Sequence, residues 1–308
     1  MINAEAAREL SMSNNFAAKI ILFGEYTLIT GSKGLAFPYS GFRANFKRAE
    51  NASDIENQFK LDKFLNYLRG TNTLASNMDL DRLEADIAEG IYVQSDIPAG
   101  YGLGSSGSLC AAIYARYAPN FERKGTYTQQ ELAALKDVMA LMEDYYHGSS
   151  SGLDCLISLI NQSILISERN KYKIVEMPDL ANLGSFYLYD SGIPRKTAPF
   201  VHLFLDRYDN DSAYKDKIDG YCDDVDKLID NVLIEDKSQF IANFAALSEF
   251  QFEYFSEMIP EKVRDIWGKG LQTGQYYFKL CGAGGGGYFI VYSNDKEFNK
   301  GCDYLAIA

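Results

Sequence analysis

The amino-acid sequence predicts an α+β protein built from two domains. Its 308 residues are enough for two domains of about 150 residues each. Apolar runs typical of strands are mixed with helical periodicities from early in the chain, and a second group of both kinds follows Leu183. We therefore expect an N-terminal domain over residues 1–182 and a C-terminal domain over residues 183–308.

In the first half of the chain, hydrophobic periodicity predicts two strands and two helices. The strands are expected over Ala18–Ile29 and Ile91–Ile97, and the helices over Ser105–Ala118 and Gln129–His147. The second helix has well-marked ends, because Thr128 and Glu131 form a capping-box pattern and Gly148 supplies a stop signal.

In the second half, the stretches GSFYLYDSG (residues 184–192) and GYFIVYS (residues 287–293) are typical of strands. Helical patterns cover Asp211–Asp230 and Lys237–Met258 between them. This second mixture of strands and helices is the reason for expecting a separate C-terminal α+β domain.

Composition excludes several classes of function. Thirty Lys and Arg against 42 Asp and Glu give a net charge of -12, the wrong sign for a phosphate backbone, so we expect no nucleic-acid partner. The cysteines are odd in number and form no CxxC pair, so neither a disulfide framework nor a zinc site is indicated. The sequence shows no export signal and no run of 18 apolar residues. We expect a cytoplasmic protein without a membrane span.

A loop rich in glycine and serine, DIPAGYGLGSSGS (residues 96–108), leads into the first predicted helix. Gly102, Gly104 and Gly107 match the GxGxxG pattern of dinucleotide-binding folds. The match is weak, because Pro98–Tyr101 separate the predicted strand from the first of these glycines. An NAD-dependent oxidoreductase therefore stays as the alternative from a different class of enzyme.

The same loop fits a phosphate cradle better. At a helix N-terminus, free backbone N–H groups and the positive end of the helix dipole both favour an anion. The serine hydroxyls add ligands for phosphate oxygens or Mg²⁺, while the glycines let the backbone approach closely. The alternative is an ordinary flexible loop capped by serine.

Two further stretches carry chemistry. KLCGAGGGGYFIVY (residues 279–292) sets five glycines within six residues, a density that costs too much chain entropy for a casual turn. EDYYHGSSSGLD (residues 143–154) ends one helix and begins the next, so Glu143 and Asp154 could face one site across the turn. Because Ser151 and Asp154 also form a capping pattern, Asp154 could instead close a helix.

Together with AKIILFGEYTLITGSKGLAF and DSGIPRKT, these stretches resemble the motifs of the GHMP kinases, which include galactokinase, homoserine kinase, mevalonate kinase and phosphomevalonate kinase. Their order and spacing match from Lys19 to Tyr292, and the fit is best for the mevalonate kinases. The resemblance implies a two-domain fold with the ATP and substrate site in the cleft between domains. It also implies transfer of the γ-phosphate of ATP to the 5-hydroxyl of mevalonate.

The resemblance assigns roles to individual residues. Asp154 would take the proton of the substrate hydroxyl or orient that hydroxyl, and Lys19 would stabilise charge during transfer. Glu143 and Ser106 would hold Mg²⁺. The ATP-binding residues implied are Gly100, Gly102, Leu103, Gly104, Ser105, Ser106, Gly107, Gly284 and Gly285, and the substrate residues are Glu25, Arg195 and Thr197. The ordinary alternatives are a solvated lysine at a strand end for Lys19, a surface glutamate at a helix end for Glu143 and an ordinary loop arginine for Arg195.

Three departures from the family pattern bear on the substrate and the turn. Ala17 and Ala18 stand where Pro-Gly is common, Tyr26 replaces a histidine, as phosphomevalonate kinases tend to show, and Ser150 replaces a proline. Few basic residues accompany the motifs, which favours an acceptor with one carboxylate over one that also carries a phosphate. Mevalonate is therefore the predicted acceptor. The alternatives are a phosphomevalonate kinase, another GHMP small-molecule kinase and a catalytically silent ATP-binding regulator. A homodimer is left open.

Overall fold

The computed structural model describes residues 15–168, 171–195, 198–295, 298 and 304–307. The chain divides into two compact units, each built from separate stretches of sequence. Unit one comprises Met1–Lys19, Pro38–Ala99 and Leu103–Gln162, and unit two comprises Ile20–Phe37, Gly100–Gly102 and Ser163–Ala308. The predicted two-part α+β organisation is confirmed, and the boundary after residue 182 stays a prediction.

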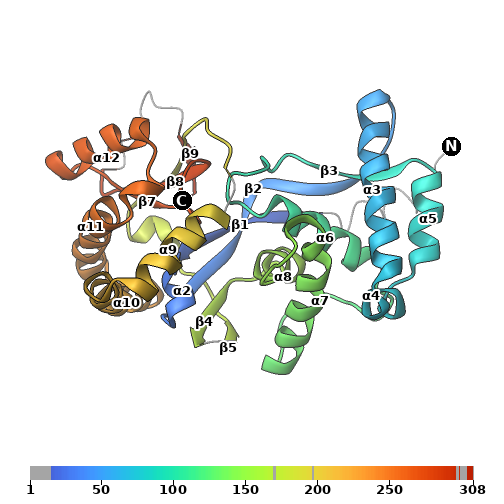
Figure 1. Ribbon diagram of the computed structural model, residues 1–308, viewed down its shortest axis with the longest axis horizontal. Helices are drawn as coiled ribbons and strands as arrows, with labels where there is room; N and C mark the ends of the chain where they lie inside the picture. Colours follow the sequence, from blue (N-terminus) through green and yellow to red (C-terminus); the bar gives the residue numbers. More distant parts are fainter. Residues whose placement is uncertain (1–14, 169–170, 196–197, 296–297, 299–303, 308) are drawn as a thin grey trace. The chain divides into compact units, whose positions relative to one another are not determined.

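Unit one combines strands with six helices of the described chain (Figure 1). The second half of β2 (Gly34–Arg48) pairs antiparallel with β3 (Ile91–Ser95), so that Arg48 lies opposite Ile91. The helices are α3 (Ala52–Gly70), α4 (Asn72–Asn77), α5 (Leu80–Ala88), α6 (Ser105–Tyr117), α7 (Gln129–His147) and α8 (Leu153–Ile160). Because β3 runs antiparallel to its neighbour, the loop after it does not belong to a parallel βαβ unit, and the dinucleotide-binding interpretation is wrong.

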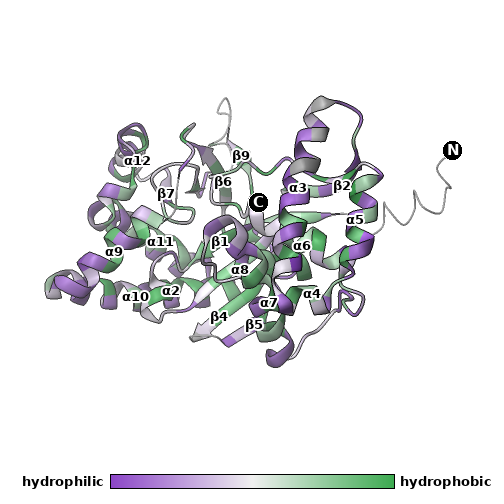
Figure 2. Ribbon diagram, turned by 45° about the vertical axis from the view of Figure 1, so that its right-hand side comes forward, coloured by the Kyte–Doolittle hydropathy of each residue, from purple (hydrophilic) through white to green (hydrophobic). Residues whose placement is uncertain are grey.

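Helix α8 is the most buried helix of unit one, because its sequence LDCLISLI is apolar on almost every side. It packs against α6 and α7, and Figure 2 shows it as largely hydrophobic. The core around these helices includes Phe46, Phe64, Leu83, Ile113, Met139, Cys155 and Leu159. This packing fixes the first turn of α8, which carries Asp154.

Unit two contains a four-stranded sheet in the order β7-β8-β6-β9, with every neighbouring pair antiparallel. The strands are β6 (Ser185–Asp190), β7 (Tyr277–Leu280), β8 (Tyr288–Ser293) and β9 (Leu305–Ala306). The helices are α9 (Ala198–Asn210), α10 (Ser212–Leu233), α11 (Lys237–Tyr254) and α12 (Glu261–Thr273). Phe186 on β6 and Tyr292 on β8 pack against Phe240 and Phe244 of α11, which forms an aromatic core.

Unit two also holds the first half of β2, which pairs with β4 (Ile164–Glu168), and β4 pairs with β5 (Lys171–Ile174). Two short 3₁₀ helices cover Leu180–Asn182 and Ser256–Met258. Within the described ranges, no helix has both the length and the apolar composition that a membrane span requires.

Most predicted elements are confirmed, with one clear error at the first strand. Strand β1 (Phe16–Phe23) ends well before Ile29, and a short helix α2 (Thr27–Thr30) follows it. Gly24 has a φ of 112° and Tyr26 a φ of 66°, and both conformations are incompatible with a strand. The predicted capping box and glycine stop of α7 are confirmed.

Candidate active site

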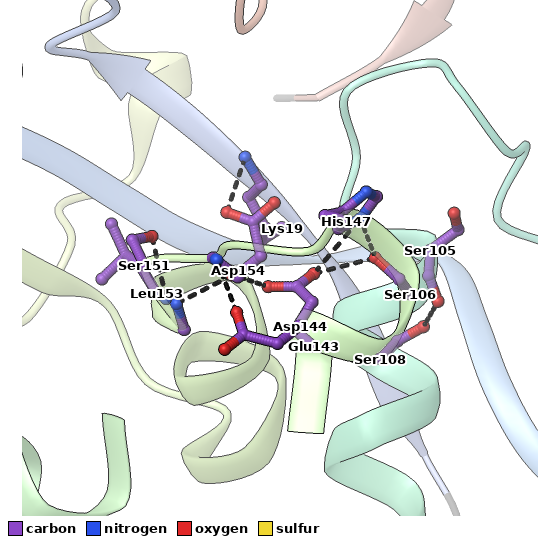
Figure 3. Close-up of polar contacts among 12 residues, drawn as sticks. Lys19, Ser105, Ser106, Ser108, Glu143, Asp144, His147, Ser151, Leu153 and Asp154 are labelled. Atoms are coloured by element: carbon purple, nitrogen blue, oxygen red, sulfur yellow. Dashed lines mark hydrogen bonds and ion pairs between the residues drawn. The ribbon is translucent and has the colours of Figure 1, made fainter. Parts of the chain in front are cut away.

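An ion pair between Lys19 and Asp154 is the centre of the candidate site in unit one (Figure 3). The Nζ of Lys19 lies 3.0 Å from Oδ1 of Asp154, and the lysine side chain is only 5% exposed. Lys19 is on β1, and its backbone N–H donates to the carbonyl of Leu103 at 3.0 Å. This bond connects the strand to the glycine–serine loop (residues 96–108), which leads into α6.

Asp154 stands in the first turn of α8, where the helix dipole attracts negative charge. The helix begins after Gly152, which has a φ of 72°, and it has no side-chain cap. The carboxylate of Asp154 therefore contacts Lys19 and does not close the helix. The capping interpretation of Asp154 is wrong.

The N-terminus of α6 lies beside this ion pair. Its N-cap, Gly104, has a φ of 75° and provides no side chain, and the N–H groups of Ser105, Ser106 and Gly107 have no acceptor in the described part of the chain. A Cβ on Gly104 would lie 3.1 Å from Cγ of Lys19 and 3.4 Å from Cβ of Asp154. Free N–H donors, a cation and a carboxylate thus meet in one place, which suits an anionic substrate.

A second carboxylate, Glu143, is held by hydroxyl groups in the same unit. It is 4% exposed at the end of α7. Ser106 donates to its Oε1 at 2.8 Å, and Ser150 donates to its Oε2. The Nε2 of His147 lies 3.0 Å from the Ser106 hydroxyl (Figure 3). The predicted pair of Glu143 and Ser106 is therefore brought together.

Sequence reasoning missed the contacts of His147 and Ser150. His147 is not among the predicted site residues, yet it lies four residues after Glu143 and therefore on the same face of α7. That spacing is a signal that could have placed it near the carboxylate. Ser150 was expected only to loosen the turn, and no spacing rule predicts its bond to Glu143.

In unit two, Glu25 forms a buried ion pair with Lys279, and both side chains are almost fully excluded from solvent. Lys279 also donates to the carbonyl of Leu280, at the start of the second glycine-rich segment. This places the predicted substrate residue Glu25 against that segment. Its role toward a substrate stays a prediction.

We define the glycine loop as Cys281–Gly287. Several of its glycines are required by close packing: a Cβ would strike the Phe200 ring at Gly285, the carbonyl of Met258 at Gly284 and the carbonyl of Ile193 at Gly286. The N–H groups of Gly282, Ala283, Gly284 and Gly286 have no acceptor among the described residues. Clustered free N–H groups of this kind form an anion-binding concavity.

Arg195 lies between the glycine loop and the short segment Gly100–Gly102, which belongs to the same unit. Its Nη2 donates to the carbonyl of Cys281 at 3.4 Å, and its backbone N–H donates to the carbonyl of Gly100 at 3.2 Å. A Cβ on Gly102 or on Gly282 would meet the same Nη2 at 2.7 or 2.6 Å. The position of the Arg195 guanidinium therefore explains why residues 102 and 282 are glycines: a larger side chain at either position would collide with it. Thr197 lies outside the described residues.

Comparison with known proteins tests the family resemblance. Residues 66–162 match the model of the GHMP kinases N terminal domain. The chain is 27% identical over 281 residues to a mevalonate kinase of Archaeoglobus fulgidus, covering 90% of this chain and 91% of that protein. A mevalonate kinase of Thermococcus sibiricus is 24% identical over 314 residues, covering 91% and 88%.

Solved structures share the fold at low identity. The L. major mevalonate kinase in complex with R-mevalonate superimposes with a TM-score of 0.63 at 16% identity, covering 93% of this chain and 88% of that chain. The Streptococcus pneumoniae phosphomevalonate kinase in complex with phosphomevalonate and AMPPNP gives a TM-score of 0.57 at 15% identity, covering 93% of each chain. The resemblance indicated by the motifs is therefore confirmed: the chain has the fold of the GHMP kinases, and residues 66–162 match the model of their N-terminal domain.

Proposed function

We propose that this chain is an ATP-dependent kinase that phosphorylates the 5-hydroxyl of mevalonate. The observation that carries the proposal is the 3.0 Å contact of Lys19 with Asp154, beside the uncapped N-terminus of α6. Phosphoryl transfer needs positioned charge more than covalent chemistry, and these groups supply it. An intact pair of this kind also argues against a catalytically silent ATP-binding regulator.

In the proposed reaction, the acceptor oxygen forms a bond to the γ-phosphorus as the bond to the bridging oxygen of ADP breaks. Asp154 accepts or directs the hydroxyl proton, and Lys19 offsets the negative charge that develops on the transferring group. The free N–H groups at the start of α6 hold phosphate oxygens. The glycine loop offers N–H donors of the same kind.

Mg²⁺ is the metal that such a reaction uses, and the residues present fit it. A hard cation takes oxygen ligands and is commonly held by one or two carboxylates together with substrate phosphates. Glu143 and Ser106 offer one carboxylate and one hydroxyl, 2.8 Å apart. When bound, Mg²⁺ would neutralise charge on the phosphates.

Mevalonate is favoured over phosphomevalonate by the relatives and by charge. The relatives that match over nine-tenths of this chain are named mevalonate kinases. Among the basic residues in the described part of the motif stretches, Lys19 is assigned to transfer, Lys279 is paired with Glu25 and Lys33 is paired with Asp230. We assign the acceptor carboxylate to Arg195, which also donates to the carbonyl of Cys281. One cation can neutralise one carboxylate, whereas a further phosphate needs more.

The test is an ADP-release assay over a panel of acceptors: mevalonate, phosphomevalonate, homoserine and galactose. We expect kcat/KM for mevalonate to be at least about tenfold above the others. If phosphomevalonate were the preferred acceptor, the substrate assignment would be wrong, but the assignment as a kinase would stand. Absence of ADP release with every acceptor, despite ATP binding, would support the regulator.

A further inference from the structure

Tyr26 has a backbone conformation that tyrosine rarely adopts. Its φ of 66° is in the left-handed region, where a bulky side chain is strained. The residue is nevertheless 5% exposed, and its ring packs against Phe204 and Phe255 with centroid distances of 4.8 and 5.3 Å. Such strain persists only where the surroundings hold the residue in place.

The hydroxyl of Tyr26 donates to the carbonyl of Ala283 at 2.6 Å, across 257 positions of sequence. Ala283 is the one residue with a side chain between Gly282 and Gly287 of the glycine loop. Burial raises the pKa of Tyr26 far above its usual value, so the phenol remains a hydrogen-bond donor. The bond therefore holds the glycine loop at its third residue.

Two neighbouring carbonyls are fixed in the same way. Lys279, held by Glu25, donates to the carbonyl of Leu280, and Arg195 donates to that of Cys281. With these carbonyls and that of Ala283 turned toward protein donors, the N–H groups of the loop are left for another acceptor. Those of Gly282, Ala283, Gly284 and Gly286 find none within the described chain.

We infer that Tyr26 is a positioning residue for the glycine loop, and that it sets the affinity for the nucleotide and not the choice of acceptor. The inference rests on the proposed kinase function, in which this loop receives phosphate oxygens. A loop that adopts its binding conformation for only part of the time binds more weakly in proportion to that fraction. The strain at Tyr26 is the local cost of holding the hydroxyl against Ala283.

This inference also removes a conflict in the substrate assignment. At the sequence level, Tyr26 in place of histidine favours a phosphomevalonate kinase. In the structure, its hydroxyl is occupied by the carbonyl of Ala283 and is buried. A group engaged in this way adds neither charge nor a free donor for a second phosphate on the acceptor.

The chain offers a matched control in Tyr214. Its ring also packs on Phe204, with a centroid distance of 6.3 Å, and its hydroxyl is buried without a hydrogen-bond partner in the described chain. Each Tyr-to-Phe substitution removes one phenolic oxygen from a ring that packs on Phe204, so the two variants disturb the aromatic cluster to a similar extent. The two variants differ in whether the loop loses an anchor.

The experiment compares the full chain with Tyr26→Phe and Tyr214→Phe. Calorimetric titration with ATP and Mg²⁺ should show about tenfold weaker binding in Tyr26→Phe, the size expected for one lost hydrogen bond in a binding loop. At saturating ATP, kcat and the KM for mevalonate should stay within about twofold of the unmodified chain, and Tyr214→Phe should match it throughout. Unchanged ATP affinity in Tyr26→Phe, or a larger rise in KM for mevalonate than for ATP, would overturn the inference.

Hydrogen exchange without any ligand separates this inference from the proposed function. The amides of Gly285 and Gly287 donate to the carbonyls of Met258 and Ile193, so they report whether the loop is held. Relative to the unmodified chain, these amides should exchange at least about tenfold faster in Tyr26→Phe and at the same rate in Tyr214→Phe. If the unmodified chain bound no ATP, the proposed kinase function would be wrong. If the two amides exchanged equally fast in both variants, Tyr26 would not hold the glycine loop in place.

Discussion

Asp154 and Lys19 show how two residues far apart in sequence can meet. The carboxylate lies in the first turn of α8, and the ammonium of Lys19 lies beside it; the lysine side chain is 5% exposed and the aspartate side chain is 30% exposed. A partly buried ion pair contributes little to net stability, because desolvation offsets its attraction. Its presence is better explained by chemistry than by folding.

Replacing Asp154 with asparagine tests that explanation. Asp154→Asn keeps the size of the side chain but cannot take a proton, so kcat should fall at least about a hundredfold while ATP affinity is retained. The melting temperature should stay within a few degrees. Asp137→Asn is the control, because Asp137 is an exposed carboxylate paired with Lys136 on α7. An unchanged kcat in Asp154→Asn would remove this residue from the mechanism.

Ser150 adds a residue-scale feature at the proposed metal site. Its hydroxyl donates to Oε2 of Glu143 and accepts from the backbone N–H of Gly152 at 3.0 Å. Proline, which the family commonly has at this position, lacks that hydroxyl. Partners that orient a metal ligand typically change metal affinity by about 10- to 100-fold when they are removed.

We therefore expect Ser150→Ala to weaken Mg²⁺ binding about tenfold, measured by calorimetric titration of Mg²⁺ into the chain with ATP present. Ser150→Thr should restore binding, because it keeps the hydroxyl. Ser151→Ala is the control: its hydroxyl accepts only from the N–H of Leu153 at 3.3 Å, in the same turn. Equal Mg²⁺ affinity in Ser150→Ala and Ser151→Ala would mean that Ser150 serves the turn alone.

At the scale of elements, the junction between the glycine–serine loop and α6 combines backbone freedom with close packing. Gly104 has a φ of 75°, which side chains rarely adopt, and it lies against Lys19 and Asp154. The first turn of α6 is left without a cap, so its N–H groups can serve a ligand. A helix N-terminus without a side-chain cap is less stable locally, but its free N–H groups are available to a ligand.

Gly104→Val should therefore abolish measurable nucleotide binding while preserving the helical circular-dichroism signal. A β-branched side chain there would be strained and would press on Lys19, whose Cγ would lie 3.1 Å from the new Cβ. Gly125→Val is the matched control, because no atom lies within 4 Å of a Cβ at that position. ATP binding of ordinary strength by Gly104→Val would contradict a phosphate site at the start of α6.

For the whole molecule, the proposed function links nucleotide binding to stability. A ligand that binds only the folded chain raises the free energy of unfolding by about 2.7 kcal/mol at 100 times its dissociation constant. ATP with Mg²⁺ should thus raise the melting temperature in a concentration-dependent way, measured by scanning calorimetry, and NAD should not. A shift with NAD and none with ATP would favour the alternative class of enzyme.

Much of this protein can be predicted from its sequence alone, because caps, turns and short motifs depend on residues that are close together along the chain. The helix over Gln129–His147 and its caps follow from a capping box and a glycine stop, which need no distant partner. The GHMP kinase resemblance likewise depends on short motifs, each of which is contiguous. The same local rules predicted strand over Ala18–Ile29 and failed at Gly24 and Tyr26, where contacts within unit two impose positive φ values.

Which side chains meet depends on the tertiary fold. Asp154 could cap a helix or face a cation, and the fold of unit one places its Oδ1 3.0 Å from the Nζ of Lys19. Tyr26 could face an acceptor, and burial against Phe204 directs its hydroxyl to Ala283 instead. Both outcomes depend on contacts between residues more than a hundred positions apart. Local sequence rules do not specify such contacts, because they are set by how buried surfaces fit together; the family resemblance assigned Lys19 and Asp154 to one site, but it did not predict the contact of Tyr26 with Ala283.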